Sequence, residues 1–504
     1  MPARTVPPIA AAPSSDGALL TLDVGTSSVR CLAFDATGAP LPGTQAARSH
    51  EPRVTADGAS ELDAPALLET TLACLGEVAQ ALHAAGRPLL GVGVCTFWHA
   101  FLAVDAAGAP LTPIFLWNDT RAAGAAKALQ RELDGPALHR RTGCVLHPSY
   151  LPARLRWLRE TRPDVWRTTR RFVSFGEYLE QTLFGAARIG LSMASGTGLL
   201  DQDTLDWDAA LLAHLHLTPE RLSPLLHEHA SLAGLTAGAA AHLPALREVP
   251  FFPALGDGAC SNLGSGATRP ELGALMVGTS AAVRAFFAEG APPAPRGLWR
   301  YLLDERRALI GGAISNGGNL LAWLQRTLRL PALEALEAEL AQMEPAGHGL
   351  TVLPFLAGER NPDYPLQAHG VIAGLTSATT PAQIAQAALE SVAFRLAAIV
   401  ERLRPAAPGL SALVASGGLL RSPTWVRMLA DVLGLPLHVS TVAEASSRGA
   451  ALLALEALGH LPAADRLPPP LGDCIEPDSA RHARYAIARE THETLYRRLV
   501  QPGV

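Results

Sequence analysis

Short apolar runs that end in glycine-rich turns recur along the chain and predict strands. The first pair lies between residues 19 and 35. An apolar run breaks at Asp23, a polar turn follows at residues 25–28, and an apolar run resumes at Val29. This period and this turn chemistry are typical of strand, turn and strand. We therefore predict a hairpin whose turn is made of glycine and small hydroxyl residues.

A second stretch repeats the first in the other half of the chain. Residues 24–30 read VGTSSVR, and residues 277–284 read VGTSAAVR, with one residue inserted before the Val-Arg pair. One such turn near the start of each half suggests duplicated halves that face each other across one nucleotide. The fold class that we predict is α/β, with two domains and a cleft between them.

Strands and amphipathic helices alternate along the rest of the chain. In the first half we predict a helix at residues 65–85, strands at 89–94 and 101–104, and a helix-rich insert at about 122–250. In the second half a helix begins after Thr380, with Pro381 at its first position and Gln383 completing a capping box. Alternation of this kind argues for α/β domains with ligands at the strand ends.

The end of the chain continues the pattern. Residues 414–423 predict a strand, a turn at Gly417 and Gly418, and a helix capped by Ser422. A helix N-terminus after such a turn can hold the anionic or adenosine part of a nucleotide, although plain punctuation between strand and helix is the alternative. The predicted divisions are a flexible leader at 1–17, an N-terminal domain at 18–266, a C-terminal domain at 267–460, and a proline-rich linker with a helical tail at 461–504.

Composition narrows the class of protein. A chain of 504 residues is too long for one core, and 48% hydrophobic residues with a net charge of −5 indicate a soluble globular protein. Lysine and arginine do not cluster with aromatic residues, so no nucleic-acid partner is expected. No apolar run approaches the roughly 18 residues of a membrane span. The six cysteines lack metal-type spacing, which favours reduced thiols in a cytoplasmic protein.

Two carboxylates stand out within this pattern. A turn of glycine and hydroxyl residues lets backbone N–H groups converge on a phosphate, and an ordinary hairpin is the alternative interpretation. Asp23, at the end of the strand before that turn, is suited to hold phosphate-bound Mg²⁺ directly or through water. Asp257 lies between Gly256 and Gly258, which leave room for a substrate beside its carboxylate.

These stretches, taken in order, resemble the FGGY family of carbohydrate kinases from about Leu19 to Leu458. The resemblance implies the duplicated actin-like, ribonuclease-H-like fold and transfer of the γ-phosphoryl group of ATP to the hydroxyl of a sugar or sugar acid. The stretches that carry it are residues 22–30, 117–121, 256–260, 278–280, 358–362 and 416–433.

Within the family the chain is most similar to the gluconate kinases. Trp98 and His99 stand where a xylulose kinase typically shows Gln-Met-His-Gly, and Thr142 followed by His147 resembles a gluconate-kinase stretch. Gly190 departs from the expected acidic residue, and Trp98 is bulkier than usual. The resemblance implies conversion of D-gluconate to 6-phosphogluconate. A xylulose kinase or another pentose or polyol kinase stays open, as does a non-catalytic actin-fold module that binds ATP.

The resemblance also implies roles for individual residues. Asp257 is the expected general base. The residues expected to bind ATP are Gly25, Thr26, Ser27, Arg30, Gly278, Thr279 and Gly317 at the phosphates, and Gly417, Gly418 and Ser422 at the adenosine end. The residues expected around the acceptor are Trp98, His99, Asp119, Arg121 and His147. Two histidines and an arginine would suit a carboxylate as well as hydroxyls.

The expected cofactors are ATP and Mg²⁺, and the expected partner is a small sugar or sugar acid. Neither a nucleic acid nor a membrane is expected as a partner, and a homodimer stays an open alternative. We further expect the two domains to close around the bound ligands, because excluding water prevents idle hydrolysis of ATP.

Overall fold

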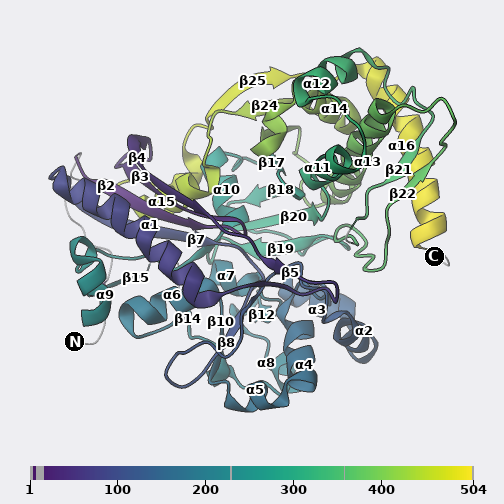
Figure 1. The fold of residues 1–504 in the computed structure, drawn as a ribbon. Helices are drawn as coiled ribbons and strands as arrows, with labels where there is room; N and C mark the ends of the chain where they lie inside the picture. The colour runs from purple at the N-terminus through teal and green to yellow at the C-terminus, as the bar shows by residue number, and fades with distance from the viewer. Residues whose placement is uncertain (1–3, 7–15, 227–229, 357, 502–504) are drawn as a thin grey trace.

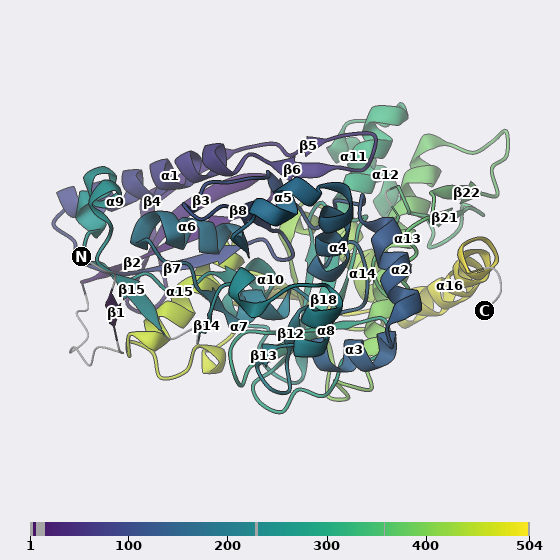
Figure 2. The same ribbon diagram turned by 90° about the horizontal axis from the view of Figure 1, so that it is seen from below.

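Two mixed β-sheets, one in each half of the chain, organise the molecule (Figure 1). The structure, a computed structural model, describes residues 4–6, 16–226, 230–356 and 358–501. In both views the N-terminal strand β1 (Arg4–Val6) and the C-terminal helix α16 (Ser479–Val500) lie at opposite ends of the molecule (Figures 1 and 2).

The first sheet is built around the predicted N-terminal hairpin. Its strand order is β16-β7-β2-β3-β4. Strand β2 runs antiparallel to β3 and parallel to β7, and β7 runs parallel to β16. All seven residues of β2 are buried, as expected of a strand covered on both faces. The strands are β2 (Ala18–Val24), β3 (Ser28–Asp35), β4 (Pro40–Ser49), β7 (Leu89–Thr96) and β16 (Leu255–Gly256).

The second sheet repeats this plan. Its order is β19-β20-β18-β17-β23-β24-β25, with a hairpin of β17 and β18 and parallel pairing of β17 to β23 and of β23 to β24. The strands β20-β18-β17-β23-β24 therefore have the same spatial order and the same relative directions as β4-β3-β2-β7-β16. This match confirms the predicted duplication. The strands are β17 (Leu272–Val277), β18 (Ala281–Phe287), β19 (Trp299–Leu302), β20 (Ala308–Ile314), β23 (Ala412–Ser416), β24 (Leu437–Ser440) and β25 (Leu471–Ile475).

Helices cover the sheets, and one of them crosses between the halves. Helix α15 (Ala445–Ala457) comes late in the chain, yet its Ala451 and Leu455 pack with Leu19 and Phe34 of the first sheet. Figure 1 shows α15 beside β2, β3 and β7. Its Ala450 carbonyl oxygen would lie 2.7 Å from a Cβ atom at Gly93 of β7, so this approach requires glycine there. The boundary between sequence halves is therefore not a boundary between packed units.

The remaining major helices follow the predicted signals. Helix α13 begins after Thr380 with the predicted capping box, in which the side chain of Thr380 accepts from the amide of Gln383. Helix α14 begins after Ser422, but a 3-10 turn at Gly417–Arg421 separates it from β23. Besides α15 and α16, the helices outside the insert are α1 (Ala64–Ala84), α10 (Asp257–Ser265), α11 (Gly318–Thr327), α12 (Leu333–Gln342), α13 (Pro381–Leu403) and α14 (Pro423–Leu433).

The insert is mainly helical, as predicted, and lies below the first sheet in the view of Figure 1. Its helices are α2 (Ala123–Glu132), α3 (Gly135–Thr142), α4 (Leu151–Thr161), α5 (Pro163–Thr168), α6 (Phe175–Phe184), α7 (Leu191–Ser195), α8 (Ala209–His214) and α9 (Ala237–His242). Its strands are β10 (Arg171–Val173), β11 (Ile189–Gly190), β12 (Leu200–Asp201), β13 (Asp206–Trp207), β14 (Leu225–Leu226) and β15 (Ser231–Ala233).

Several short strands were not expected. Strands β5, β6 and β9 form a small sheet beside the insert, and β21 pairs with β22 in the second half. Their bounds are β5 (Arg53–Val54), β6 (Ser60–Leu62), β9 (Ile114–Phe115), β21 (Thr351–Leu353) and β22 (Val371–Ala373). Runs of two or three residues carry too few alternating positions for periodicity to reveal them. Strand β8 (Leu102–Val104), in contrast, confirms the strand predicted at 101–104.

Both ends of the chain pair with the body of the molecule, and the predicted helical tail is confirmed as α16. Strand β1 pairs antiparallel with β15, so this part of the predicted flexible leader is tied to the insert, while residues 1–3 and 7–15 lie outside the described residues. At the other end, β25 extends the second sheet by pairing with β24, and α16 packs against α14 and β21. The predicted linker and tail therefore belong to the body of the second half.

Among the described residues, α13 is the only helix with the length and apolar character of a membrane span. Of its most apolar window, 83% is buried inside the molecule, where it packs against α14 and the second sheet. This is the environment of a core helix.

Candidate active site

The carboxyl ends of three parallel strands converge on one point. In the register of the first sheet, Thr96 of β7 pairs with Val24 of β2 on one side and with Gly256 of β16 on the other. The residues that follow these strands, at 25–27, 97–99 and 257, are therefore neighbours. Ligands of open α/β sheets bind at such strand ends.

The two repeated turns face one cavity together with Asp257. This cavity, of about 440 Å³, is lined by Thr26 and Ser27 of the first turn and by Gly278 and Thr279 of the second. Trp98, His99, Trp117 and Asn118 line it from the first half, and Arg284, Trp299, Tyr301 and Arg360 from the second. The structure thus brings together segments more than two hundred residues apart in the chain.

The turns present backbone donors to this cavity. The amide of Gly25 closes its own turn by donating to the Ser28 carbonyl at 2.9 Å, and the amide of Gly278 donates to Ser280 at 2.8 Å. No described carbonyl accepts from the amides of Thr26 or Thr279. Unpaired amides at the tip of a tight turn are suited to hold phosphate oxygens.

Gly317 supports the second turn from behind. Its amide donates to the Thr279 carbonyl at 3.0 Å, and the next amide, of Gly318, donates to Gly278 at 2.7 Å. A Cβ atom on Gly317 would lie 2.8 Å from the carbonyl of Ser280. Gly317, predicted to bind phosphate, thus has its amide engaged in holding the turn.

The residues predicted at the adenosine end lie beside the second turn. Gly417 has φ of +85° and follows β23, the parallel neighbour of β17, and both Gly417 and Gly418 are exposed. Ser422 is engaged elsewhere: its hydroxyl accepts from the amide of Trp425 at 3.2 Å and donates to Glu337 at 2.6 Å. Ser422 is therefore a helix cap fastened to α12.

Two carboxylates at this site are held largely out of water. Burial, with the negative charge of Asp257 as the next cause, raises the pKa of Asp23 from 3.8 to about 6. Burial also raises the pKa of Asp257, although the charge of Arg284 and the amide of Gly258, which donates to Oδ1 at 2.7 Å, oppose the shift. A pair of this kind gains stability from any cation brought between or beside its members.

Trp98 explains why glycines flank Asp257. Its ring lies where a Cβ atom on Gly256 would have to be, and a Cβ atom on Gly258 would lie 2.8 Å from its Cζ3. The indole Nε1 donates to the carbonyl of Ser192 in α7 at 2.9 Å, and the Ser192 hydroxyl accepts from the amide of Gly256 at 3.1 Å. The bulky ring that departs from the family pattern is thus accommodated by the backbone on either side of Asp257.

His99 is presented to the cavity as a neutral acceptor. Its Nδ1 lies 2.5 Å from the carbonyl oxygen of Gly196, which can only accept, so Nδ1 carries the proton. Burial lowers the pKa of His99 to about 3. Its φ of +64° is maintained by Arg154, which donates to the His99 carbonyl. The other ring nitrogen is therefore free of a proton and suited to accept from a substrate hydroxyl.

Arg284 and Arg360 line the cavity and were not among the predicted site residues. Arg360 lies over the ring of Trp117 at 4.2 Å, and Arg284 is only 6% exposed. The sequence signal for Arg284 was an arginine inside the apolar strand Ala-Ala-Val-Arg-Ala-Phe-Phe, two positions from Ala282, which also lines the cavity. A charge at a buried strand position is itself a sign of function.

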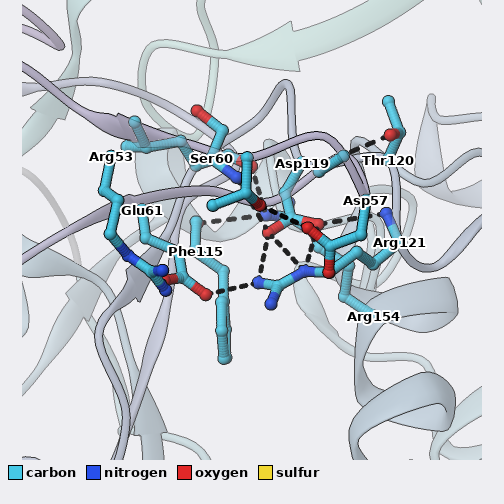
Figure 3. A network of polar contacts seen from close by, with 12 residues as sticks. Arg53, Asp57, Ser60, Glu61, Phe115, Asp119, Thr120, Arg121 and Arg154 are labelled. Atoms are coloured by element: carbon cyan, nitrogen blue, oxygen red, sulfur yellow. Dashed lines mark hydrogen bonds and ion pairs between the residues drawn. The ribbon is translucent and has the colours of Figure 1, made fainter.

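Asp119 and Arg121 do not line the cavity. Arg121 Nη2 donates to Asp119 at 2.6 Å and to Glu61 of β6 at 2.6 Å, and Asp119 accepts from the amide of Ser60 at 3.3 Å (Figure 3). The guanidinium lies over the ring of Trp157 at 4.8 Å. This network joins β6 to the loop after β9, so the structure gives the pair a role in folding and leaves Trp117 and Asn118 at the cavity.

His147 is also outside the cavity lining. It is 5% exposed, its Nδ1 lies 3.0 Å from the hydroxyl of Ser149, and its ring packs against Tyr364 at 5.0 Å. Burial lowers the pKa of His147 to about 3. His147 is therefore a buried, neutral histidine that does not line the cavity.

Arg30 is engaged at the back of the first turn. It lies 3.2 Å from Glu444 and 3.9 Å from Asp23, and it does not line the cavity. The described residues contain no cluster of three or more histidine, cysteine, aspartate or glutamate side chains suited to a metal ion. Asp23 is 6% exposed and lies outside the cavity lining, and a single carboxylate suits only a metal that is held mainly by phosphate oxygens.

A duplicated α/β fold, with one repeated turn from each half lining a cavity beside a single carboxylate, is the arrangement of ATP-dependent kinases built on the actin-like fold. Comparison with known proteins identifies the family within this class. Models of the FGGY family of carbohydrate kinases match residues 18–264 with the N-terminal domain and residues 273–458 with the C-terminal domain. The chain belongs to the FGGY family of carbohydrate kinases and is an ATP-dependent sugar kinase.

Individual relatives carry different substrate names, which include gluconate, xylulose and glycerol. A gluconokinase of Bacillus subtilis (strain 168) is 27% identical, over 92% of this chain and 93% of that protein. A xylulose kinase of Streptomyces rubiginosus is 31% identical, over 90% of each chain. Among solved structures, a gluconate kinase from Lactobacillus acidophilus is similar in fold, with a TM-score of 0.88, 23% identity and coverage of 96% of this chain and 99% of that chain. Membership of the family sets aside a non-catalytic nucleotide-binding module.

Proposed function

We propose that this kinase phosphorylates D-gluconate to 6-phosphogluconate, with Asp257 as the general base. The observation that carries the proposal is the position of Asp257 in the cavity that both turns line. A carboxylate there can reach an acceptor hydroxyl while the amides of the turns hold the phosphates of ATP. The raised pKa of Asp257 brings its basicity closer to that needed to accept a proton.

The transfer needs positioning and charge neutralisation more than covalent chemistry. The amides of Thr26 and Thr279 hold the γ-phosphoryl group from opposite sides. The acceptor hydroxyl gives its proton to Asp257 as its oxygen bonds to the γ-phosphorus, and the bond from that phosphorus to the bridging oxygen breaks, leaving its electron pair on ADP. Mg²⁺ bound with ATP, held by Asp23, would neutralise charge on the phosphates.

The charges around the cavity support an acidic acceptor. Arg284 and Arg360 both line it, while Asp257 is the one carboxylate among the described lining residues. A neutral ketose offers no negative charge to match this excess. The likeness to gluconokinases supports the same choice, although xylulose kinases match at similar identity. ATP and sugar acids of this kind are used in the cytoplasm, where we propose that the enzyme acts.

Turnover on D-gluconate, D-xylulose, D-ribulose and glycerol, followed by coupled detection of ADP, tests the proposal. The expected result is a kcat/KM for gluconate at least tenfold above that for any neutral acceptor. A flat profile, or a tenfold preference for xylulose, would replace gluconate with the neutral acceptor and leave the assignment to sugar kinases intact.

A further inference from the structure

Arg284 is a buried cation that has no partner of its own. It is 6% exposed, and no described residue forms a hydrogen bond or an ion pair with its guanidinium. Its Nε and Nη1 atoms are buried, and the side chain lines the active-site cavity. Buried charges in proteins are normally paired, because removing an ion from water is costly. An unpaired buried cation that lines a ligand cavity indicates that an anionic ligand pairs with it.

The surroundings of Arg284 leave its charge only partly balanced. Asp257 is the carboxylate whose charge most affects the pKa of Arg284, but the described residues form no ion pair with Arg284 within 4.0 Å. Arg360 adds positive charge on the same side, and burial lowers the pKa of Arg284. The site is therefore short of one negative charge, which an anionic ligand would supply.

The position of Arg284 indicates which anion it meets. The phosphates of ATP belong to the two turns, and Arg284 lies along β18 beyond the second turn. Its Nη2 would be 3.1 Å from a Cβ atom on Gly258, the same residue against which the ring of Trp98 packs. Tyr301, whose ring lies 4.8 Å from that of Trp98, completes this wall. Arg284 thus belongs with the side chains around the acceptor.

We propose that Arg284 binds the carboxylate of an aldonate acceptor and that this contact makes the enzyme prefer a sugar acid to a neutral sugar. The inference rests on the proposed function, because it assumes that the acceptor reacts at Asp257. A planar guanidinium can donate two parallel hydrogen bonds to a carboxylate. Gly258 lets the Arg284 guanidinium lie at this place, since a side chain at residue 258 would occupy the space that the guanidinium and Trp98 share.

The test compares D-gluconate with D-gluconamide, which replaces the carboxylate by a neutral group of the same shape. The wild-type enzyme is expected to prefer gluconate. In Arg284→Met the KM for gluconate should rise about 10²-fold, the size of effect expected when one partner of a buried charge pair is removed. The KM values for gluconamide and ATP should change little, so the preference for the acid disappears.

Two further variants separate this role from others. Arg53→Gln removes an exposed positive charge next to Pro52, which lines the cavity, and should leave the preference unchanged. Arg284→Lys keeps the charge but loses the fork, and should reduce the preference about tenfold. If Arg284→Met does not fold, the test uses Arg284→Lys in its place. A preference of Arg284→Lys for gluconate over gluconamide that equals that of the wild type would overturn the inference.

The outcomes distinguish the two proposals. A wild-type enzyme that prefers neutral sugars overturns the proposed substrate before any variant is made. A wild-type preference for gluconate that survives in Arg284→Met overturns the role of Arg284 alone. An equal loss of kcat on gluconate and gluconamide would mean that Arg284 only positions Asp257, which also overturns the inference.

Discussion

Individual side chains at the site are held in unusual states by their neighbours. Burial shifts both Asp23 and Asp257 toward their neutral forms. Burial also keeps His99 neutral, although its hydrogen bond to the Gly196 carbonyl raises the pKa of the ring and so acts against this shift. The acceptor therefore meets a base of raised pKa and a histidine that accepts a hydrogen bond. Arg284 supplies the positive charge that opposes the shift at Asp257.

The shifted carboxylates predict the pH dependence of activity. Asp257 must be deprotonated to act as a base, and a raised pKa means that this form is lost at a higher pH than usual. The kcat/KM for gluconate should therefore fall on acidification at a higher pH than expected for an ordinary aspartate, because burial raises the pKa of Asp257. Because the two carboxylates interact, the midpoint belongs to the pair. An activity that stays constant down to pH 4 would contradict this assignment.

The glycine before the base predicts a steric effect. Gly256→Ala would place a methyl group inside the ring of Trp98, so the ring must move. We expect a loss of about 1–3 kcal/mol in the free energy of unfolding, measured with denaturant, together with reduced kcat. Gly124→Ala, in α2 with open space at its Cβ position, is the matched control and should not destabilise the protein. Equal stability of the two variants would show that Trp98 is not packed as described.

Among the elements, the short helix α7 and the loop after it connect the insert to the chemistry. Ser192 holds both Trp98 and Gly256, and Gly196 holds His99. In the same element, the hydroxyl of Ser195 accepts from the amide of Leu302 in β19 at 2.9 Å. One short helix thus positions acceptor residues and joins them to the second half.

The loop after β9 predicts a separation between stability and binding. Arg121→Met would leave Asp119 and Glu61, both nearly fully buried, without their shared cation. We expect a loss of about 3 kcal/mol in the free energy of unfolding, with little change in the KM for gluconate. Arg53→Gln removes an exposed partner of the same Glu61 and should cost about 0–1 kcal/mol. If Arg121→Met instead raised the KM for gluconate strongly and left the stability unchanged, Arg121 would have to be placed in the acceptor pocket.

Long elements with clear end signals could be predicted from the sequence, and contacts between distant segments could not. The hairpins, the capping box at Thr380 and the cap at Ser422 follow from local patterns. Strand β25 was hidden because an edge strand of five partly exposed residues has no buried face to reveal it. The packing of α15 on the first sheet depends on contacts between distant segments, which no local sequence pattern predicts. The same holds for the ion pairs of Arg121.

The site was predictable to a similar extent. The turns, Asp257, Trp98 and His99 were expected and lie at one cavity, because each follows a strand end of a sheet whose topology the repeat implied. Asp119, Arg121 and His147 carry the right chemistry, but their partners in neighbouring loops could not be seen in the sequence. Arg284 was seen only as part of the repeated turn, because its place at the cavity depends on contacts between distant segments.

At the scale of the whole molecule, the site lies between halves that are also joined by α15 and α10. The backbones of these two helices approach closely at two glycines, since Gly264 meets Ala445 and Gly449 meets Cys260. We expect the two halves to rotate about this contact when ligands bind. The cavity is lined by residues of both halves, so such a rotation would change its width.

This arrangement predicts closure on binding both substrates. With a non-hydrolysable ATP analogue and gluconate together, the radius of gyration from small-angle scattering should decrease, and it should decrease less with either ligand alone. Closure excludes water from the γ-phosphate until the acceptor is present. Scattering curves that do not change with both ligands would argue for a rigid cleft.

The most direct test of the central claim is the turnover number of Asp257→Asn, measured alongside its affinity for ATP. The asparagine keeps the shape of the side chain and cannot take the proton of the acceptor. The account predicts that kcat on gluconate falls about 10²- to 10⁴-fold while the Kd for ATP stays close to that of the wild type. A variant that turns over at nearly the wild-type rate would contradict phosphoryl transfer at this carboxylate.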